Sequence, residues 1–354
     1  MIEVAGDLLE GGGQIVRTTI ALAALTGKAI RITKIREKRP NPGLQAQHVV
    51  AVKAVSAISN AETPSLIQGS RELVFHPRGR ASGHFSFEVG TAGSIPLILQ
   101  ALLLAAAFAP SQLEFEITGG TDVKWSPTID YLRLVQFPIL QVMAYNQISI
   151  DVERRGHYPK GGGRVSVTIE PPRILQGIRF LEKGRLLKVE GISHCVKLPS
   201  HVAERQTKAA SEKLRINGFS NVTIATETYP AHQDPHLAPG SGITLAAKFD
   251  NGLVIGADSV GERGKPAEKV GQEAANKLII ELSSQAPIDS HMGDMLIPYM
   301  AVAQGRSEIQ ISEITLHTMT NIKVAEMITD TKFEIQGDLH QPGKISVYGV
   351  GLKT

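Results

Sequence analysis

Residues 90–110 read GTAGSIPLILQALLLAAAFAP, a glycine-containing turn that runs directly into a long apolar segment and stops at a proline. The apolar part, from Ile95 to Ala109, is interrupted by Pro96 and Gln100. It is also shorter than the ~20 apolar residues that a membrane-spanning helix needs. We therefore expect a helix buried in the core of a folded domain rather than in a bilayer.

The same pattern occurs twice more along the chain. Residues 10–17 (EGGGQIVR) lead into an apolar segment at 18–26, and residues 289–295 (DSHMGDM) lead into another at 296–304. The three apolar segments are each followed by a segment typical of a β-strand, at 29–35, 112–118 and 308–316. Repeats of this length are typical of duplicated units that pack helices against sheets. We predict an α/β (α+β) fold with three repeated helix-on-sheet units.

The pattern changes between the second and third units. Two units carry a further segment with helical spacing, at 43–60 and 130–144. The following region predicts a strand, a helix and three strands, at 186–196, 201–217, 221–227, 243–249 and 253–259. A helix at 268–284 is expected to return the chain to the main body. We expect a main domain formed by 1–183 plus 272–354, and a smaller inserted β-α-β-β domain at 184–271.

Composition limits the class of protein. The 354 residues include 37 Lys and Arg against 34 Asp and Glu, a formal net charge of +3. This near-balance excludes a histone-like polycation and an acidic disordered chain, but it does not exclude a local basic patch. The single Cys195 excludes an intrachain disulfide and a zinc site built from several thiolates, and we interpret it as a small buried hydrophobic residue. Acidic residues at 1–7 argue against a secretion signal, so we expect a cytoplasmic protein without a membrane span.

Two segments carry residues suited to phosphate chemistry. Glycine turns before helices direct N–H groups at anions, although none of the three turns fits a known phosphate fingerprint and each is also explained as a tight turn. In residues 36–48 (REKRPNPGLQAQH), Arg36 and Arg39 precede a proline-rich turn. Together with Arg17 they are suited to paired hydrogen bonds with phosphate oxygens. A solvated loop is the alternative interpretation.

Two further features are distinctive. Residues 155–165 (RGHYPKGGGRV) contain three consecutive glycines that let the backbone approach another group closely, or that form a turn before a strand. His317 ends the alternating segment 309–316 and is followed by Thr318, Thr320 and Asn321. A histidine at a strand end beside hydroxyls and an amide is a candidate nucleophile or base, with a structural histidine as the alternative.

Six motifs in a fixed order carry a resemblance to a known family. They are EGGGQ with Arg17 at 10–17, RPNPGL at 39–44, QH at 47–48, GGTD at 119–122, RGHYPKGGG at 155–163 and LHTMTN at 316–321. On these motifs the chain resembles the RNA 3′-terminal phosphate cyclases over essentially its whole length. The resemblance implies three α/β units similar to the C-terminal domain of bacterial translation initiation factor three, with a smaller inserted domain. It also implies ATP-dependent conversion of an RNA 3′-phosphate into a 2′,3′-cyclic phosphodiester, with release of AMP and diphosphate.

The resemblance further implies roles for individual residues. His317 matches the histidine that attacks the α-phosphorus of ATP. The positions that match ATP contacts are Gln100, Pro127, His291, Met292, Gly293, Asp294 and Met295. The positions expected to hold the terminal RNA phosphates are Arg17, Arg36, Arg39, Gln47 and His48. Glu10 matches a position that contacts metal or the RNA end, and Mg²⁺ or Mn²⁺ is expected with ATP. His291 departs from relatives that carry tyrosine there.

Three alternatives stay open from the sequence. A noncatalytic branch of the same family binds RNA in ribosome assembly, but it lacks the nucleophilic histidine that is present here as His317. The enolpyruvyl transferases use a similar repeated scaffold, but they do not need the string at 155–163. A plain RNA-binding module is the third alternative. Basic segments without interleaved aromatic residues favour a partner gripped only at its 3′-phosphate end over a long single strand. An oligomer is compatible with the sequence, which does not determine it.

Overall fold

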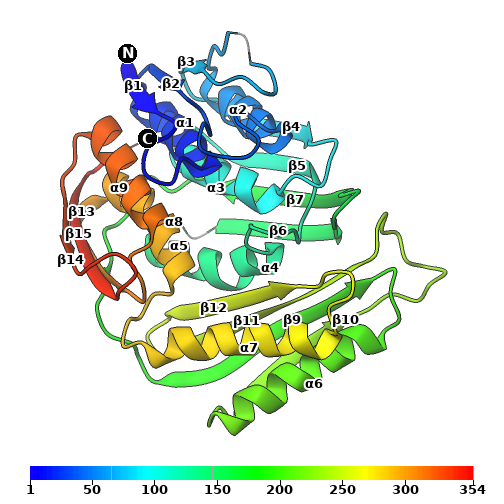
Figure 1. Cartoon of the computed structure of the whole chain (residues 1–354). Coiled ribbons are helices and arrows are strands. Elements are labelled where there is room, and N and C mark those ends of the chain that lie inside the picture. Colours follow the sequence, from blue (N-terminus) through cyan, green and yellow to red (C-terminus); the bar gives the residue numbers. More distant parts are fainter. Residues whose placement is uncertain (65, 146, 354) are drawn as a thin grey trace.

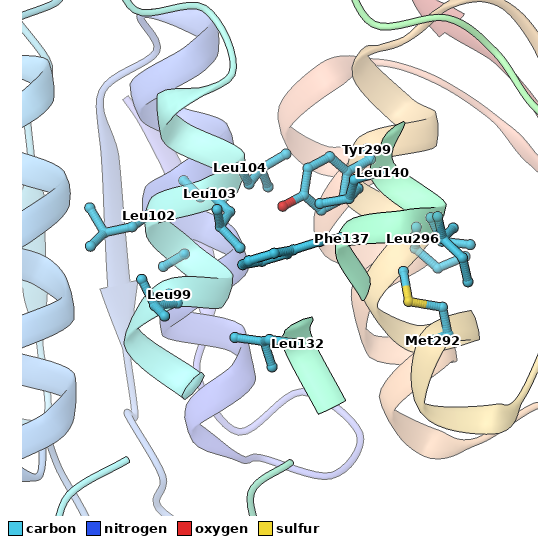
Figure 2. Close-up of a cluster of buried hydrophobic side chains, with 14 of the residues drawn as sticks. Leu99, Leu102, Leu103, Leu104, Leu132, Phe137, Leu140, Met292, Leu296 and Tyr299 are labelled. Atoms are coloured by element: carbon cyan, nitrogen blue, oxygen red, sulfur yellow. The ribbon is translucent and has the colours of Figure 1, made fainter. Parts of the chain in front are cut away.

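The apolar segment at 95–109 forms a helix that is buried in the core. A computed structural model describes residues 1–64, 66–145 and 147–353. In it, α3 (Ile95–Ala106) begins at Ser94, whose hydroxyl accepts a hydrogen bond from the N–H of Leu97 at 3.1 Å. All residues of α3 except Leu97 and Gln100 are buried. Figure 2 shows leucines of this helix facing Phe137, Leu140 and residues of a second apolar helix. Within the described residues, none of the helices combines the length and the apolar character needed to cross a bilayer.

A β-α-β arrangement with parallel strands opens the N-terminal part of the chain (Figure 1). Its elements are β1 (Ile2–Ala5), α1 (Gly13–Thr26), β2 (Ile30–Thr33), α2 (Ala46–Ser59) and β3 (Leu73–Phe75). β1 pairs with β2 in parallel, with Ile2 opposite Ile30, and β2 pairs with β3 in the antiparallel sense. A parallel pair needs a crossover, which α1 supplies.

A second sheet contains the strands that precede and follow α3 in the chain. Its strands and the helices that follow α3 are β4 (Gly83–Glu88), β5 (Leu113–Gly119), α4 (Ile129–Tyr131), a π-helical turn (Leu132–Gln136), α5 (Phe137–Val142), β6 (Gln147–Arg154) and β7 (Gly163–Glu170). β4 and β5 are parallel across α3, and the strand order is β4-β5-β7-β6. The single helix expected at 130–144 is instead broken, because a π-helical turn intervenes and α5 begins with Pro138 in its first turn.

A third sheet has the order β14-β15-β13-β8. Its elements are β8 (Arg179–Phe180), α8 (Ser290–Val302), β13 (Gln304–Ile311), α9 (Leu316–Thr329), β14 (Phe333–Gln336) and β15 (Gly343–Val350). β8 and β13 are again parallel, with Glu308 opposite Arg179. The apolar helix begins at Ser290 rather than at 296. The strand expected at 308–316 ends at Ile311, and the chain then enters α9.

The segment between β8 and α8 forms a fourth sheet with its own helices. Its elements are β9 (Leu186–Val196), α6 (His201–Ile216), β10 (Val222–Glu227), β11 (Gly240–Phe249), β12 (Val254–Val260) and α7 (Ala267–Ser283). The strand order is β10-β9-β11-β12. α6 and α7 lie side by side against this sheet, where Gly271 of α7 packs on the backbone of Gln206 (Figure 1). The boundary predicted at 271 falls within α7, and the division into a main and an inserted domain stays a prediction. We call the segment from β9 to α7 the inserted unit and the rest of the chain the main body.

These elements confirm the mixed α/β fold class. The chain alternates helices with four sheets in the described residues, and apolar helices cover the sheets. The core is continuous between the second and third sheets. In Figure 2, Met292, Leu296 and Tyr299 of α8 face the cluster formed by α3, Leu132 and the α5 residues.

Candidate functional site

His317 lies in the first turn of α9, so the expectation that it ends a strand is wrong. Thr315 caps this helix: its hydroxyl accepts from the N–H of Thr318 at 3.0 Å, and the Thr318 hydroxyl accepts from the N–H of Thr315 at 3.1 Å. The reciprocal pair ends the extended chain and starts the helix at Leu316. The side chain of His317 is 45% exposed, which leaves the imidazole accessible from solvent.

Asp294 of α8 holds the start of α9 in place through hydrogen bonds. Its Oδ1 accepts hydrogen bonds from the hydroxyls of Thr315 at 2.6 Å and Thr318 at 2.5 Å. Its backbone carbonyl accepts from the side-chain amide of Asn321 at 2.7 Å, and Asn321 in turn accepts from the hydroxyl of Thr18 on α1. Burial raises the pKa of Asp294 even though these hydroxyls favour its charged form. This network fixes the position of the His317 backbone relative to α1 and α8.

The ring of His317 is oriented by residues that precede and begin α1. Its Nδ1 lies 2.7 Å from Oε2 of Glu10, and it also contacts Oε1 of Gln14. The side-chain amide of Gln14 donates to the backbone carbonyl of His317 at 3.2 Å. With Nδ1–H directed at a carboxylate, the neutral ring carries its lone pair on Nε2. This Nε2 forms no hydrogen bond within residues 1–64, 66–145 and 147–353.

Arg39 and Arg17 place positive charge next to the carboxylate of Glu10. Arg39 forms an ion pair with its Oε1. Burial by itself raises the pKa of Glu10, but the hydrogen bonds and charges of His317 and Arg39 outweigh it and hold the pKa below its usual value. Burial lowers the pKa of the neighbouring Arg17 to about 10, against the effect of the Glu10 charge, so Arg17 stays cationic at neutral pH.

His48 and Gln47 begin α2 beside this cluster. Nδ1 of His48 accepts from the N–H of Gln45 at 2.9 Å, and the ring lies against Gly13, where any side chain would collide with it. Burial, together with the charges of Arg17 and Arg36, lowers the pKa of His48 to about 3, so its ring is neutral. Gln47 accepts from the N–H of Ser94 at 2.8 Å and so links α2 to the start of α3.

Residues expected to hold an RNA phosphate thus fall into two groups. Arg39 pairs with Glu10, the charge of Glu10 acts on Arg17, and the charge of Arg17 acts on His48. The guanidinium of Arg36 instead binds the backbone carbonyls of Asn41 and Gly43, and Gln47 binds Ser94. In the described conformation, Arg36 and Gln47 therefore shape the loop and the helix that carry the other three.

The residues expected to contact ATP differ in accessibility. His291 is exposed at the start of α8, edge-on to Tyr131 with the ring centroids 6.2 Å apart, and Met295 is partly exposed. Asp294 binds the threonines of α9. The side chain of Met292 is fully buried in the apolar cluster of Figure 2, so any contact that this position makes with ATP would come from its backbone; the contact itself stays a prediction.

The remaining expected ATP contacts lie elsewhere on the same helices and loops. Gly293 is buried against Ile311 of β13 and offers no side chain. Gln100 is partly exposed on α3, and Pro127 is partly exposed next to Ser126. The Ser126 hydroxyl lies 2.5 Å from that of Ser94, so Pro127 is tied to the same end of α3 as Gln47.

Both oxygens of Glu10 are engaged by basic groups in the described conformation, and its expected contact with a metal or the RNA end stays a prediction. One of its oxygens is engaged by Arg39 and the other by His317. Mg²⁺ in nucleotide sites is held by one or two carboxylates together with phosphates and water, and a carboxylate paired with two basic groups is a poor donor for it. We therefore interpret Glu10 as the residue that orients His317.

Sequence reasoning missed the residues that position His317. Gln14 belongs to the quoted EGGGQ motif, but only the fold shows that it reaches the histidine 303 residues away. Thr315 and Thr318 stand three residues apart, the spacing of a capping box, and this spacing was a usable signal for the start of α9. Asn321 and Thr18 gave no such signal, because their hydrogen bond joins two distant helices.

The sequence matches a family model and several named proteins that carry the same description. A family model described as RNA 3′-terminal phosphate cyclase matches residues 8–335. The chain is 49% identical over 351 residues to a protein of Ignicoccus hospitalis named RNA 3′-terminal phosphate cyclase, covering 99% of both chains. A protein of the same name from Hyperthermus butylicus is 49% identical over 359 residues, covering 100% of this chain and 99% of its own. One from Methanopyrus kandleri is 47% identical over 347 residues, covering 98% of each.

Proposed function

The chain belongs to the RNA 3′-terminal phosphate cyclase family, and from this premise we propose that it is an enzyme that uses ATP to convert an RNA 3′-terminal phosphate into a 2′,3′-cyclic phosphodiester. The observation that carries the proposal is the geometry of His317, an exposed imidazole whose Nδ1 is held 2.7 Å from the Glu10 carboxylate while Nε2 is left without a partner among the described residues. A noncatalytic relative would have no use for a histidine poised in this way.

The proposed reaction has three steps. Nε2 of His317 attacks the α-phosphorus of ATP, and diphosphate leaves as the N–P bond forms. A 3′-phosphate oxygen of RNA then attacks the same phosphorus, which breaks the N–P bond and gives an RNA–AMP anhydride. Finally the 2′-hydroxyl attacks the 3′-phosphorus, losing its proton and expelling AMP. Covalent catalysis of this kind divides one difficult displacement into easier ones.

The chain's own residues support the first two steps. Glu10 holds the proton on Nδ1 and stabilises the positive charge that develops on the imidazole when Nε2 forms its bond. Arg39 and Arg17 present cations next to Glu10, where a terminal phosphate would approach. A divalent ion would shield the charge of the triphosphate. The use of Mg²⁺ or Mn²⁺ stays a prediction. A cytoplasmic location also stays a prediction.

The decisive experiment incubates the protein with α-labelled ATP and a divalent metal, and measures acid-labile label on the polypeptide. We expect wild type to be labelled and His317→Ala to take up none. His340→Ala is the matched control, because His340 is an exposed histidine whose Nδ1 also lies 2.7 Å from a glutamate, Glu313. Unlabelled wild type, or equal labelling of His317→Ala, would refute the proposed mechanism and favour a noncatalytic relative.

A second arm tests the RNA site with RNA that ends in a 3′-phosphate. Arg39→Ala should still adenylylate itself but transfer AMP to RNA poorly, because the lost guanidinium is proposed to bind the terminal phosphate. Lys38→Ala controls for general loss of charge, since Lys38 is exposed on the same loop and donates to the backbone carbonyl of Asp7. Equal transfer by Arg39→Ala and wild type would remove Arg39 from the RNA site.

A further inference from the structure

A second cluster of chemically capable side chains lies away from His317, where the inserted unit meets the second sheet. Asp122 follows β5, His157 follows β6 and His194 lies on β9. All three side chains are buried, with residue exposures of 1%, 4% and 1%. One potential ligand atom from each lies within 4.8 Å of the others. The mechanism proposed above uses none of these residues.

The two imidazoles meet through the same ring atom. Nε2 of His194 lies 3.3 Å from Nε2 of His157 and 3.8 Å from Oδ2 of Asp122. In a tetrahedral zinc site with Zn–N bonds of 2.0–2.1 Å, neighbouring ligand nitrogens are separated by about 3.3–3.4 Å. The observed separation of the two Nε2 atoms therefore suits ligands of one ion as well as it suits a hydrogen bond.

A hydrogen bond between the histidines leaves part of the cluster unexplained. Oδ2 of Asp122 accepts from the hydroxyl of Thr121 at 2.6 Å and from Arg155 at 3.2 Å. Its Oδ1 is buried and has no partner among the described residues. Buried polar atoms are normally paired, and a bare carboxylate oxygen is costly. Oδ2 is the oxygen that lies 3.8 Å from Nε2 of His194, so a cation bound by both carboxylate oxygens would also give Oδ1 a partner.

The surrounding charge also favours a cation. Asp122, Asp130 and Glu227 all bind Arg155, and Arg133 binds the other oxygen of Asp130. With all three carboxylates ionised and the histidines neutral, they face two guanidiniums and carry a formal charge of −1. Asp122, Asp130 and Arg155 are buried, whereas Glu227 and Arg133 are about one-third exposed. Burial raises the pKa of Asp130, and a bound cation would favour its charged form.

The neighbouring strand leaves room for both rings. A side chain at Gly240 of β11 would collide with the ring of His157, and one at Gly242 would lie 2.8 Å from Cε1 of His194. The two glycines are on the strand that pairs with β9, with Gly242 opposite His194. The inserted unit thus supplies one imidazole and the space into which both imidazoles fit.

We propose that Asp122, His157 and His194 form a binding site for a zinc-class transition-metal ion that clamps the inserted unit to the main body. Two imidazole nitrogens and a carboxylate oxygen are ligands suited to Zn²⁺, and three protein ligands leave a fourth position for water. Asp122 and His157 come from the second sheet's connections and His194 from the inserted sheet, so the ion would join two parts of the chain that are otherwise held by side-chain contacts.

The test uses the full chain, stripped with a chelator and free of nucleotide, titrated separately with Zn²⁺ and Co²⁺. We expect one ion per chain and, with Co²⁺, the visible absorption of a tetrahedral nitrogen and oxygen site. Zn²⁺ should also raise the thermal unfolding temperature of the stripped wild type. Absence of stoichiometric binding to wild type would overturn the proposal, and this result does not depend on any variant folding correctly.

Variants then locate the ion. His194→Gln, His157→Gln and Asp122→Asn should each weaken binding at least ~100-fold, since each removes a ligand. His201→Gln, an exposed histidine of the inserted unit, and His317→Ala should bind the ion as wild type does. Circular dichroism confirms that each variant is folded. Binding that survives in His194→Gln, or that is lost in His317→Ala, would overturn the assignment to this cluster.

Discussion

The reactivity proposed for His317 depends on which ring nitrogen carries the proton. The Glu10 carboxylate at 2.7 Å and Gln14 both face Nδ1, so the proton is held there and the lone pair is on Nε2. The charge of Glu10 persists at neutral pH because His317 and Arg39 keep its pKa low. In the proposed mechanism, one carboxylate would therefore determine both the tautomer of the histidine and the stability of the imidazolium that forms during attack.

Replacing Glu10 with glutamine tests this role. Glu10→Gln keeps the size of the side chain but removes its charge and allows its amide to face Nδ1 with a donor. We expect self-adenylylation to slow by roughly 10²-fold or more, as when a catalytic base loses the group that orients it. Single-turnover labelling with α-labelled ATP measures the rate. Glu313→Gln, beside His340, is the matched control. An unchanged rate in Glu10→Gln would mean that Glu10 does not orient His317.

At the scale of elements, sequence patterns locate those whose ends have local signals. The strand expected at 186–196 is β9 with the same bounds, and the helix expected at 201–217 is α6, one residue shorter. α9 was missed because the apolar alternation runs past Ile311 as far as Leu316, while its weak Thr315–Thr318 cap lacks the usual glutamate.

The sequence contains no comparable local pattern that predicts contacts between distant elements. The residues expected near the RNA end were found from family motifs, and the structure then brings Glu10, Arg39 and His317 into direct contact. Whether Arg36 reaches a phosphate or holds its own loop depends on the path of the backbone at 41–43. Local propensity does not determine that path, since tertiary packing overrides it.

Asp289, which caps α8, is expected to make the stability of the protein depend on pH. Asp289 caps α8 through the N–H of Met292 at 2.9 Å, and it also accepts from the Tyr131 hydroxyl at 2.6 Å and from the N–H of Gly256 at 3.0 Å. Burial, reinforced by the charge of Glu281, raises its pKa from 3.8 to about 6. The folded state therefore holds a proton that the unfolded state has released between these two values, so Asp289 makes the protein less stable as pH rises through this window.

We expect Asp289→Asn to remove this pH dependence. The free energy of unfolding of wild type, relative to the variant, should fall by about 2 kcal/mol between pH 4 and pH 6.5. A separate, pH-independent cost is expected, because an amide nitrogen cannot accept from the N–H of Gly256. Urea unfolding at a series of pH values measures both. Asp338→Asn, at an exposed aspartate, should leave the difference flat. A flat difference for Asp289→Asn as well would contradict the raised pKa.

At the scale of the whole molecule, one buried arginine contacts carboxylates of both the inserted unit and the main body. Arg155 is 1% exposed. Its Nε and Nη2 donate to both oxygens of Glu227 on β10 at 2.7 Å, and its other contacts are Asp122 at 3.2 Å and Asp130 at 2.8 Å. Two of the three carboxylates belong to the main body and one to the inserted sheet. The unusual string at 155–163 thus serves the junction of the two parts, a role that its sequence alone does not indicate.

Removing this arginine should loosen the junction. Arg155→Ala leaves the buried Asp122 without its arginine and Asp130 with Arg133 alone, and we expect a loss of about 3–5 kcal/mol in the free energy of unfolding. Arg155→Lys should recover only part of it, because one ammonium cannot reproduce the fork that binds Glu227. Arg164→Ala is the control: Arg164 also pairs with two glutamates, Glu116 and Glu153, but it is 47% exposed, so we expect a loss below ~1 kcal/mol.

Urea unfolding measures the loss in all three variants. Limited proteolysis should cut Arg155→Ala fastest in the connections between β8 and β9 and between α7 and α8. An effect of Arg155→Ala as small as that of Arg164→Ala would mean that packing, rather than this charge network, holds the inserted unit in place.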